Sequence, residues 1–192
     1  MTERQPPTSQ EYIEQLFSPE REEELDTFMA MSFMPIDPYD RVADIGCGPG
    51  YFSIPMAKHL VHGKLYALDM DDEMLDALRP RVEEAKLGNV EVLKCGATDF
   101  PLEAESLDGV LLAFVTHQSE DRIAFLETVL DLLRPRGWCV VLEWHRETTE
   151  SGPPLERRIN PDELEALAVE AGYRFRWWRD LNCSQYMALL RK

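Results

Sequence analysis

Two kinds of hydrophobic pattern alternate along most of the chain. Short apolar runs typical of buried strands recur at residues 41–45, 64–69, 90–95, 107–114 and 138–144. Segments with apolar positions at helical spacing lie between them, at residues 51–60, 71–88 and 120–135. Because parallel neighbours in a sheet need a crossover of about a dozen residues or more, typically a helix, this alternation predicts an α/β fold with a parallel sheet.

Residues that start and stop helices support this division. Asp71 is the predicted N-cap of helix 71–88, and Gly88 is its predicted end. Within residues 51–60, Pro55 is compatible with a helix only near the first turn. The sequence therefore places the beginning of the helix at residues 51–60 close to Pro55.

The C-terminal part of the chain departs from the alternation. A helix at residues 160–173 has Asn160 as its N-cap and Gly172 just past its last turn. The strand-like segments 173–180 and 185–192 follow, joined only by the four residues LNCS. Such a short connection predicts an antiparallel hairpin at a sheet edge.

The N-terminal part predicts a helix laid over this unit. Residues 18–33 begin with Ser18 as an N-cap, Pro19 at the first helical position and acids in the first turn. We therefore expect a helical lead-in, residues 1–37, followed by one α/β domain, residues 38–192.

Composition and charge narrow the classes of partner. The chain has 192 residues, of which 44% are hydrophobic, which is enough for one domain with a full core. Its net charge of −16 repels phosphate backbones, so nucleic acid is not an expected partner. No apolar run approaches the roughly 18 residues of a membrane span, and the first residues lack a signal-peptide pattern. We expect a cytoplasmic protein with no membrane span.

The cysteines give no sign of a metal centre or a disulfide framework. Cys47, Cys95, Cys139 and Cys183 lie far apart, and no two of them form a CxxC pair. In a cytosolic protein such thiols are normally reduced, so we expect no disulfide framework. Because the cysteines lack the spacing of a metal site, we also predict no bound metal.

The glycine-rich stretch DIGCGPG carries the candidate chemistry. Gly46, Gly48 and Gly50 alternate directly behind the first predicted strand, with Asp44 in front. Ligands of open α/β sheets bind at the carboxyl ends of the strands, glycine lets the backbone approach a ligand closely, and the following helix start offers amide donors. The spacing differs from the dinucleotide fingerprint GxGxxG, and a carboxylate before the loop favours an ammonium group over a pyrophosphate.

This stretch resembles motif I, DxGxGxG, of the class I S-adenosylmethionine-dependent methyltransferases. The resemblance covers roughly residues 38–190 and is closest to the type 11 branch that acts on small molecules such as quinone precursors. It implies a Rossmann-like, doubly wound, seven-stranded mixed sheet of order 3-2-1-4-5-7-6 with strand seven antiparallel. It also implies S-adenosyl-L-methionine as the cofactor.

The resemblance further implies which residues hold the cofactor. Asp69, at the end of the second predicted strand, matches the acid that takes both ribose hydroxyls, and Asp44 and a carbonyl near Ala113 would serve the ammonium group. The implied cofactor-binding set is Asp44, Gly46, Cys47, Gly48, Gly50, Asp69, Met70, Gly96, Ala97, Thr98, Ala113 and Phe114.

The adenine end departs from the family pattern. Family members commonly place an acid where this chain has Gly96. The adenine contact then falls to the backbone of Ala97 and Thr98 or to Asp99.

Histidines supply the candidate catalytic groups. His117 follows the fourth predicted strand and should lie beside the transferable methyl. An imidazole there suits a general base for a hydroxyl, amine or thiol, although a histidine that only shapes the pocket is an equal interpretation. Glu143 and His145, at the end of the fifth strand, are second candidates.

These observations predict a methyltransferase that acts by in-line displacement on a small-molecule substrate, with a homodimer left open. The alternative is a non-catalytic, S-adenosylmethionine-binding scaffold protein with the same fold. A third hypothesis, a nicotinamide oxidoreductase, predicts stabilisation by NAD instead. Residues 152–158, GPPLERR, are a candidate lid over the substrate.

Overall fold

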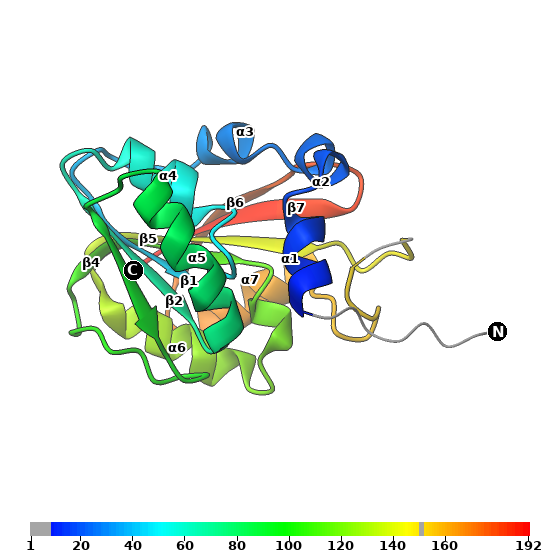
Figure 1. Ribbon diagram of the computed structural model, residues 1–192. Helices are drawn as coiled ribbons and strands as arrows, with labels where there is room; N and C mark the ends of the chain where they lie inside the picture. Colours follow the sequence, from blue (N-terminus) through cyan, green and yellow to red (C-terminus); the bar gives the residue numbers. More distant parts are fainter. Residues whose placement is uncertain (1–8, 150–151) are drawn as a thin grey trace.

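A seven-stranded sheet forms the centre of the molecule (Figure 1) in the computed structural model, which describes residues 9–149 and 152–192. The strands are β1 (Arg41–Ile45), β2 (Lys64–Asp69), β3 (Val90–Lys94), β4 (Leu107–Ala113), β5 (Leu133–Trp144), β6 (Arg174–Asp180) and β7 (Gln185–Arg191). Their order is β3-β2-β1-β4-β5-β7-β6, and β7 runs antiparallel to both of its neighbours. The predicted strand order and the C-terminal hairpin are thereby confirmed.

Helices cover both faces of the sheet. They are α1 (Ser9–Leu16), α2 (Pro19–Glu24), α3 (Thr27–Met31), α4 (Ser53–His59), α5 (Asp72–Glu84), α6 (Arg122–Leu132) and α7 (Pro161–Glu170), with a 3₁₀ turn η1 (Thr116–Gln118). In Figure 1, α4 and α6 lie on opposite sides of the sheet.

Alternate side chains of each strand supply the two halves of the core. In β2, Leu65 packs in the cluster that contains α4, and Ala67 packs against α5. Tyr66 and Leu68 point to the other face and pack in the cluster that contains α6 and α7. A strand buried on both faces shows a continuous apolar run, which is why the sequence pattern identified these strands.

The predicted helix at residues 18–33 is wrong in one respect: it is broken in two. The α2 helix ends at Glu24, Leu25 is extended and fully buried, and Asp26 then caps α3. The Asp26 carboxylate accepts hydrogen bonds from the backbone amides of Phe28 (2.8 Å) and Met29 (3.2 Å). A second capping acid inside the run restarts the helix and lets Leu25 enter the core. The sequence pattern also missed α1.

The predicted end of helix 71–88 is also wrong. Asp71 caps the start as expected, because its carboxylate accepts a hydrogen bond from the amide of Glu73 (2.9 Å). The helix ends at Glu84, however, and Lys86 rather than Gly88 takes the left-handed conformation, with φ +53°. At the last helix the expected caps are confirmed: Asn160 accepts from the amide of Glu163 (2.8 Å), and Gly172 has φ +94°.

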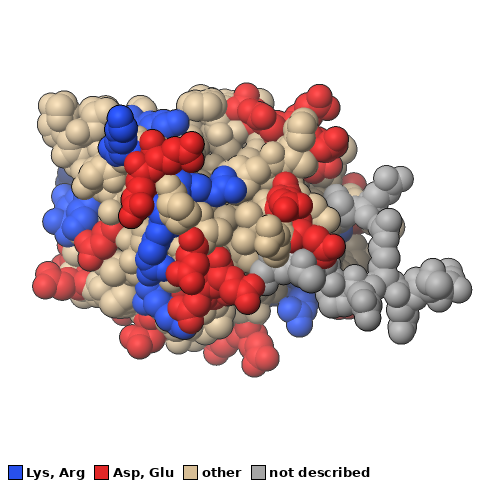
Figure 2. Space-filling model, in the orientation of Figure 1, with Lys and Arg blue, Asp and Glu red and all other residues tan. Residues whose placement is uncertain are grey.

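Charged side chains are mixed on the surface. On the face shown in Figure 2, Lys and Arg lie among Asp and Glu and do not form one continuous basic area. Several make ion pairs, such as Arg79 with Asp76 (2.9 Å) and Lys64 with Glu91 (2.6 Å). Across residues 9–149 and 152–192, no helix combines the length and apolar character needed to cross a membrane.

Candidate active site

A cavity of about 840 Å³ opens where β1, β2 and β4 end. Its size lies within the range of about 300–1,000 Å³ that is usual for small-molecule sites. The predicted residues that line it are Asp44, Gly46, Cys47, Gly48, Asp69, Met70, Gly96, Ala97, Ala113, Phe114 and His117. Gly50 and Thr98 lie outside the cavity wall. The sheet therefore brings together most of a set that is scattered over seventy-odd positions of the chain.

The glycine loop wraps over the end of β2. The amides of Gly46 and Cys47 donate to the carbonyl of Leu68 (2.8 and 3.0 Å), and both Gly46 and Gly48 have positive φ, +72° and +52°. A Cβ added at Gly48 would meet no atom within 4 Å, so this residue presents bare backbone to open space. Such a loop can approach a ligand closely.

Gly50 serves packing rather than the cavity. Its φ is +94°, and a Cβ there would lie 2.4 Å from Leu78 Cδ1 of α5. The structure thus places this predicted cofactor residue behind the loop, where it allows α5 to pack closely.

Asp44 is a buried acid on the cavity wall. Its side chain is only 1% exposed, and its Oδ2 accepts a hydrogen bond from Ser53 Oγ (2.5 Å). Burial raises the pKa of Asp44 to about 7; the Ser53 hydrogen bond opposes this rise, and the nearby Asp69 charge adds to it. A cationic group in the cavity would relieve the cost of ionising this carboxylate.

The contribution of Asp44 to the stability of the ligand-free protein is expected to fall as the pH rises from about 4 to about 7. An aspartate in the unfolded chain ionises near pH 3.9, whereas Asp44 in the folded protein keeps its proton to about pH 7. Between these values the folded state binds the extra proton, so stability decreases with pH, by about 4 kcal/mol in total. Urea unfolding of wild type and Asp44→Asn across this range measures the difference.

The stability of Asp44→Asn relative to wild type should therefore rise across this range. A matched control is Asp76→Asn, since the Asp76 side chain is 76% exposed and lies on the outside of α5. This control should keep the wild-type slope. Parallel curves for wild type and Asp44→Asn would show that Asp44 does not hold the proton.

Asp69 is oriented by two backbone amides. Its Oδ2 accepts from the amide of Gly48 (2.7 Å), and its Oδ1 accepts from the amide of Asp71 (3.0 Å). A carboxylate has about four acceptor positions, so two of them remain for a ligand. Asp69 is therefore a fixed hydrogen-bond acceptor on the cavity wall.

The predicted adenine region forms a tight turn. The amide of Gly96 donates to the carbonyl of Asp99 (2.9 Å), and Gly96 and Ala97 line the cavity. Thr98 and Asp99 are exposed and lie outside its wall. Of the alternatives that the sequence left open, this geometry favours the backbone near Ala97, and the apolar ring of Phe100 also lines the cavity.

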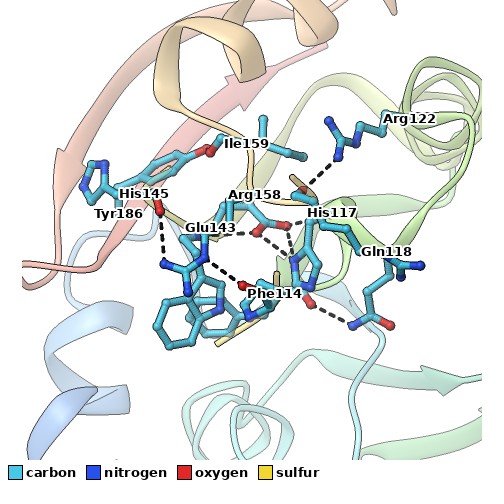
Figure 3. A network of polar contacts seen from close by, with 12 residues as sticks. Phe114, His117, Gln118, Arg122, Glu143, His145, Arg158, Ile159 and Tyr186 are labelled. Carbon is cyan, nitrogen blue, oxygen red and sulfur yellow. Dashed lines mark hydrogen bonds and ion pairs between the residues drawn. The ribbon is translucent and has the colours of Figure 1, made fainter. Parts of the chain in front are cut away.

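His117 and Glu143 form one buried pair. Glu143, near the end of β5, is fully buried, and its carboxylate lies 2.9 Å (Oε2) and 3.2 Å (Oε1) from His117 Nδ1. Figure 3 shows the ring of His117 against this carboxylate. Phe114, with φ +59°, turns the chain after β4 so that η1 brings His117 back toward β5. Two residues that the sequence offered as competing candidates are thus partners.

The other histidines lie elsewhere. His145 Nε2 lies 2.8 Å from Asp180 Oδ1, and its ring packs against Tyr186 at a centroid distance of 5.0 Å, outside the cavity wall. His62 stacks on the exposed Tyr39. Within residues 9–149 and 152–192, no group of three His, Cys, Asp or Glu side chains is arranged to hold a metal ion.

The two thiols at the cavity are poor nucleophiles near neutral pH. Burial, together with the charge of Asp69, raises the pKa of Cys95 to about 11. Burial also raises the pKa of the Cys47 thiol, as do the neighbouring carboxylates of Asp44 and Asp69. Both residues therefore act as cavity lining.

Sequence reasoning missed the roof of the cavity. Arg21 of α2 lines it, with its guanidinium 5.1 Å from the Phe114 ring centroid and 5.8 Å from that of Tyr51. Trp144, whose ring centroid is 5.8 Å from that of Phe114, forms a further wall. The position of Trp144 at the carboxyl end of a strand could have identified it, whereas no local pattern marks Arg21.

The candidate lid reaches the cavity. Gly152 and Pro153 line it, and a Cβ at Gly152 would lie 2.9 Å from the Trp144 ring. Arg158 holds this segment by donating to the carbonyls of Pro153 (2.9 Å) and Glu147 (2.6 Å). The loop therefore closes one side of the cavity.

Comparison with known proteins identifies relatives of this chain. A family model described as a methyltransferase domain matches residues 42–137, half of the chain. The demethylmenaquinone methyltransferase of Bacillus mycoides (strain KBAB4) is 28% identical over 119 residues, which cover 62% of this chain and 50% of that protein. The chain thus spans about half the length of the curated relatives it matches.

Solved structures give the same fold. A SAM-dependent methyltransferase from Aquifex aeolicus superposes with a TM-score of 0.88 at 26% identity, over 97% of this chain and 99% of that chain. The [4+2]-cyclase SpnF has a TM-score of 0.77 at 14% identity, over 86% of this chain and 79% of that chain. The likeness to the cyclase shows the fold alone.

Proposed function

The chain belongs to the class I S-adenosylmethionine-dependent methyltransferases, and on this premise we propose that it transfers a methyl group from S-adenosylmethionine to a small-molecule acceptor. One observation carries the proposal: a single cavity joins the glycine loop and the acids Asp44 and Asp69 to the imidazole of His117. The glycine loop and the two acids suit the cofactor, and the imidazole of His117 suits an acceptor.

The residues at the glycine loop fit S-adenosylmethionine. Buried Asp44 would pair with the ammonium group, the open backbone at Gly48 would lie along the methionine part, and Asp69 would accept from the ribose hydroxyls. When bound, the cofactor supplies a methyl group activated by a positively charged sulfur. The acidic wall attracts such a cation.

The acceptor would lie among aromatic side chains. Phe114, Trp144 and Tyr51 line the cavity together with Arg21 and His117. Flat apolar walls suit a planar acceptor, and the relatives named demethylmenaquinone methyltransferase act, by that name, on a quinone. Alignment of acceptor and methyl for in-line displacement can lower the barrier by about 7–11 kcal/mol.

The alternative is a protein that binds the cofactor without turning it over. The likeness to a cyclase supports keeping this alternative, because the same fold is compatible with a named activity other than methyl transfer. Incubation with S-adenosylmethionine and reduced demethylmenaquinone bearing a short side chain separates the two. Release of S-adenosylhomocysteine with a methylated product supports the proposal; saturable binding without either product supports the alternative.

Cofactor choice has its own test. Thermal unfolding should show stabilisation by S-adenosylmethionine, about 2.7 kcal/mol at a ligand concentration about 100 times Kd. NAD should give no stabilisation. The reverse result would favour an oxidoreductase.

Replacing Asp69 by Ala is expected to weaken S-adenosylmethionine binding about tenfold. The change removes an acceptor for the ribose hydroxyls, and hydrogen bonds to a charged group are worth about 1.5–3 kcal/mol. Isothermal titration calorimetry measures the affinity. Asp72→Ala is the control, since Asp72 is an exposed neighbour that pairs with Lys94 outside the cavity. Equal affinity for wild type and Asp69→Ala would remove Asp69 from the ribose site.

A further inference from the structure

We propose that Glu143 is a positioning residue that fixes His117 in the tautomer with its proton on Nδ1, so that Nε2 can take the proton of a hydroxyl group on the acceptor. This inference rests on the proposed function and narrows it: the acceptor is an aromatic hydroxyl compound.

The first argument is the number of donors that meet one carboxylate. Glu143 Oε1 accepts from the backbone amide of His117 (2.9 Å) and lies 3.2 Å from its Nδ1. Oε2 lies 2.9 Å from Nδ1 and accepts from the amide of Trp144 (3.3 Å). An ionised carboxylate can only accept, so every group that faces it must donate. Nδ1 of the neutral ring therefore carries the proton.

The second argument is burial. Glu143 is fully buried, and His117 is 8% exposed. A fully buried carboxylate is held in place by the donors around it, so its position and that of the ring determine each other. The backbone amide of His117 donates to the same carboxylate. Glu143 therefore holds both the 3₁₀ turn and the His117 side chain.

The third argument is the direction of the other ring nitrogen. Nδ1 faces Glu143, and Nε2 lies on the opposite side of the ring, while His117 itself lines the cavity. Among the residues that the structure describes, Nε2 has no hydrogen-bond partner. Its lone pair is therefore available to a group in the cavity.

The proton transfer balances with methyl transfer. His117 Nε2 takes the hydroxyl proton and becomes an imidazolium, which Glu143 stabilises. The electron pair left on the acceptor oxygen forms the new bond to the methyl carbon, and the methyl–sulfur bond breaks with its pair on sulfur. If the pair instead attacks from the adjacent ring carbon, the hydrogen of that carbon returns to the oxygen. One positive charge is present before the step and one after it.

The cavity walls favour an aromatic hydroxyl acceptor over an alkylamine. An aromatic hydroxyl reaches a neutral-pH site with its proton and needs a base to become a nucleophile. The planar walls formed by Phe114 and Trp144 suit an aromatic ring.

The chain contains a matched control for the pair. His145 and Asp180 form a second histidine–carboxylate contact at 2.8 Å, but the Asp180 side chain is 66% exposed and lies outside the cavity. Asp180→Asn makes the same chemical change as Glu143→Gln at a site that this proposal does not use.

The test combines spectroscopy with kinetics. Nitrogen-15 NMR of the ring nitrogens reads the tautomer of His117 in the protein without cofactor, with His117→Gln to assign the signal. Steady-state rates use S-adenosylmethionine and reduced demethylmenaquinone with a short side chain. The same acceptor with both hydroxyls blocked as methyl ethers tests the need for a hydroxyl.

The expected result is a proton on Nδ1 in wild type and Asp180→Asn, and loss of this single tautomer in Glu143→Gln. The side-chain amide of a glutamine accepts through its oxygen and donates through its NH2 group. It therefore cannot accept from all the donors that contact Glu143 in the wild-type protein. The kcat of Glu143→Gln should fall by at least about 10-fold, because a positioned general base contributes about 10²- to 10⁴-fold, with KM for the cofactor unchanged. The blocked acceptor should not react.

Three results would overturn the proposal. They are a proton on Nε2 in wild type, full kcat in Glu143→Gln, or turnover of the blocked acceptor. The wild-type spectrum gives its answer even where Glu143→Gln does not fold. If the spectrum shows Nδ1–H but no acceptor is methylated, the proposed function fails and the base role falls with it, while the tautomer assignment stands.

Discussion

Replacing His117 by Ala is expected to lower kcat for a hydroxyl acceptor by about 10²- to 10⁴-fold. This is the usual contribution of a positioned general base. The change removes the ring that Glu143 holds at 2.9 Å and leaves the glycine loop, Asp44 and Asp69 in place. Affinity for S-adenosylmethionine should therefore stay within about twofold.

Steady-state kinetics and calorimetry on the same preparation measure both quantities. His62→Ala is the control, because His62 stacks on the exposed Tyr39 away from the cavity. It should keep full activity. An unchanged kcat in His117→Ala would make the imidazole a part of the cavity wall only, the second interpretation that the sequence allowed.

The second large effect concerns the fold. Replacing Gly109 by Ala is expected to lower the free energy of unfolding by about 3 kcal/mol, the upper end of the usual overpacking cost. Gly109 of β4 lies opposite Trp138 of β5, and a Cβ there would lie 2.0 Å from Trp138 Cε2. The indole is 3% exposed and its Nε1 donates to Asp40 (3.3 Å), so it must leave a packed position to make room.

Thermal and urea unfolding test this expectation. A loss of about 3 kcal/mol corresponds to a drop in Tm of about 6–12 °C for a chain of this size. Gly88→Ala is the matched control: a Cβ there meets no atom within 4 Å, so its stability should stay within about 0.5 kcal/mol of wild type. Wild-type stability in Gly109→Ala would mean that the Trp138 ring can move at little cost.

The strands could be predicted because their signal is local. Buried parallel strands such as β1 and β4 are apolar on both faces, so each shows a continuous hydrophobic run. The short LNCS connection between β6 and β7 likewise left a hairpin as the simplest arrangement. The strand order itself came from the family resemblance rather than from these runs.

The helix ends were harder, because competing caps decide them. Asp26 and Ser18 are both good N-caps, and only the burial of Leu25 between them determines that one helix becomes two. At the end of α5, Lys86 takes the left-handed position two residues before the glycine that the sequence offered. Packing of the chain overrides the small preference for glycine at such a position.

The sequence by itself determined the alternating strands and helices and the presence of a glycine loop directly behind Asp44, since these features depend on residues close together in the chain. Only the tertiary structure decided that His117 and Glu143, 26 positions apart, share one buried contact, and that Arg21 and Trp144 reach the same cavity. It also placed Gly50, which the sequence had assigned to the cofactor site, against Leu78 of α5. The physical reason is that a side chain acquires its partner, burial and direction from neighbours brought by the sheet, and no local pattern contains that information.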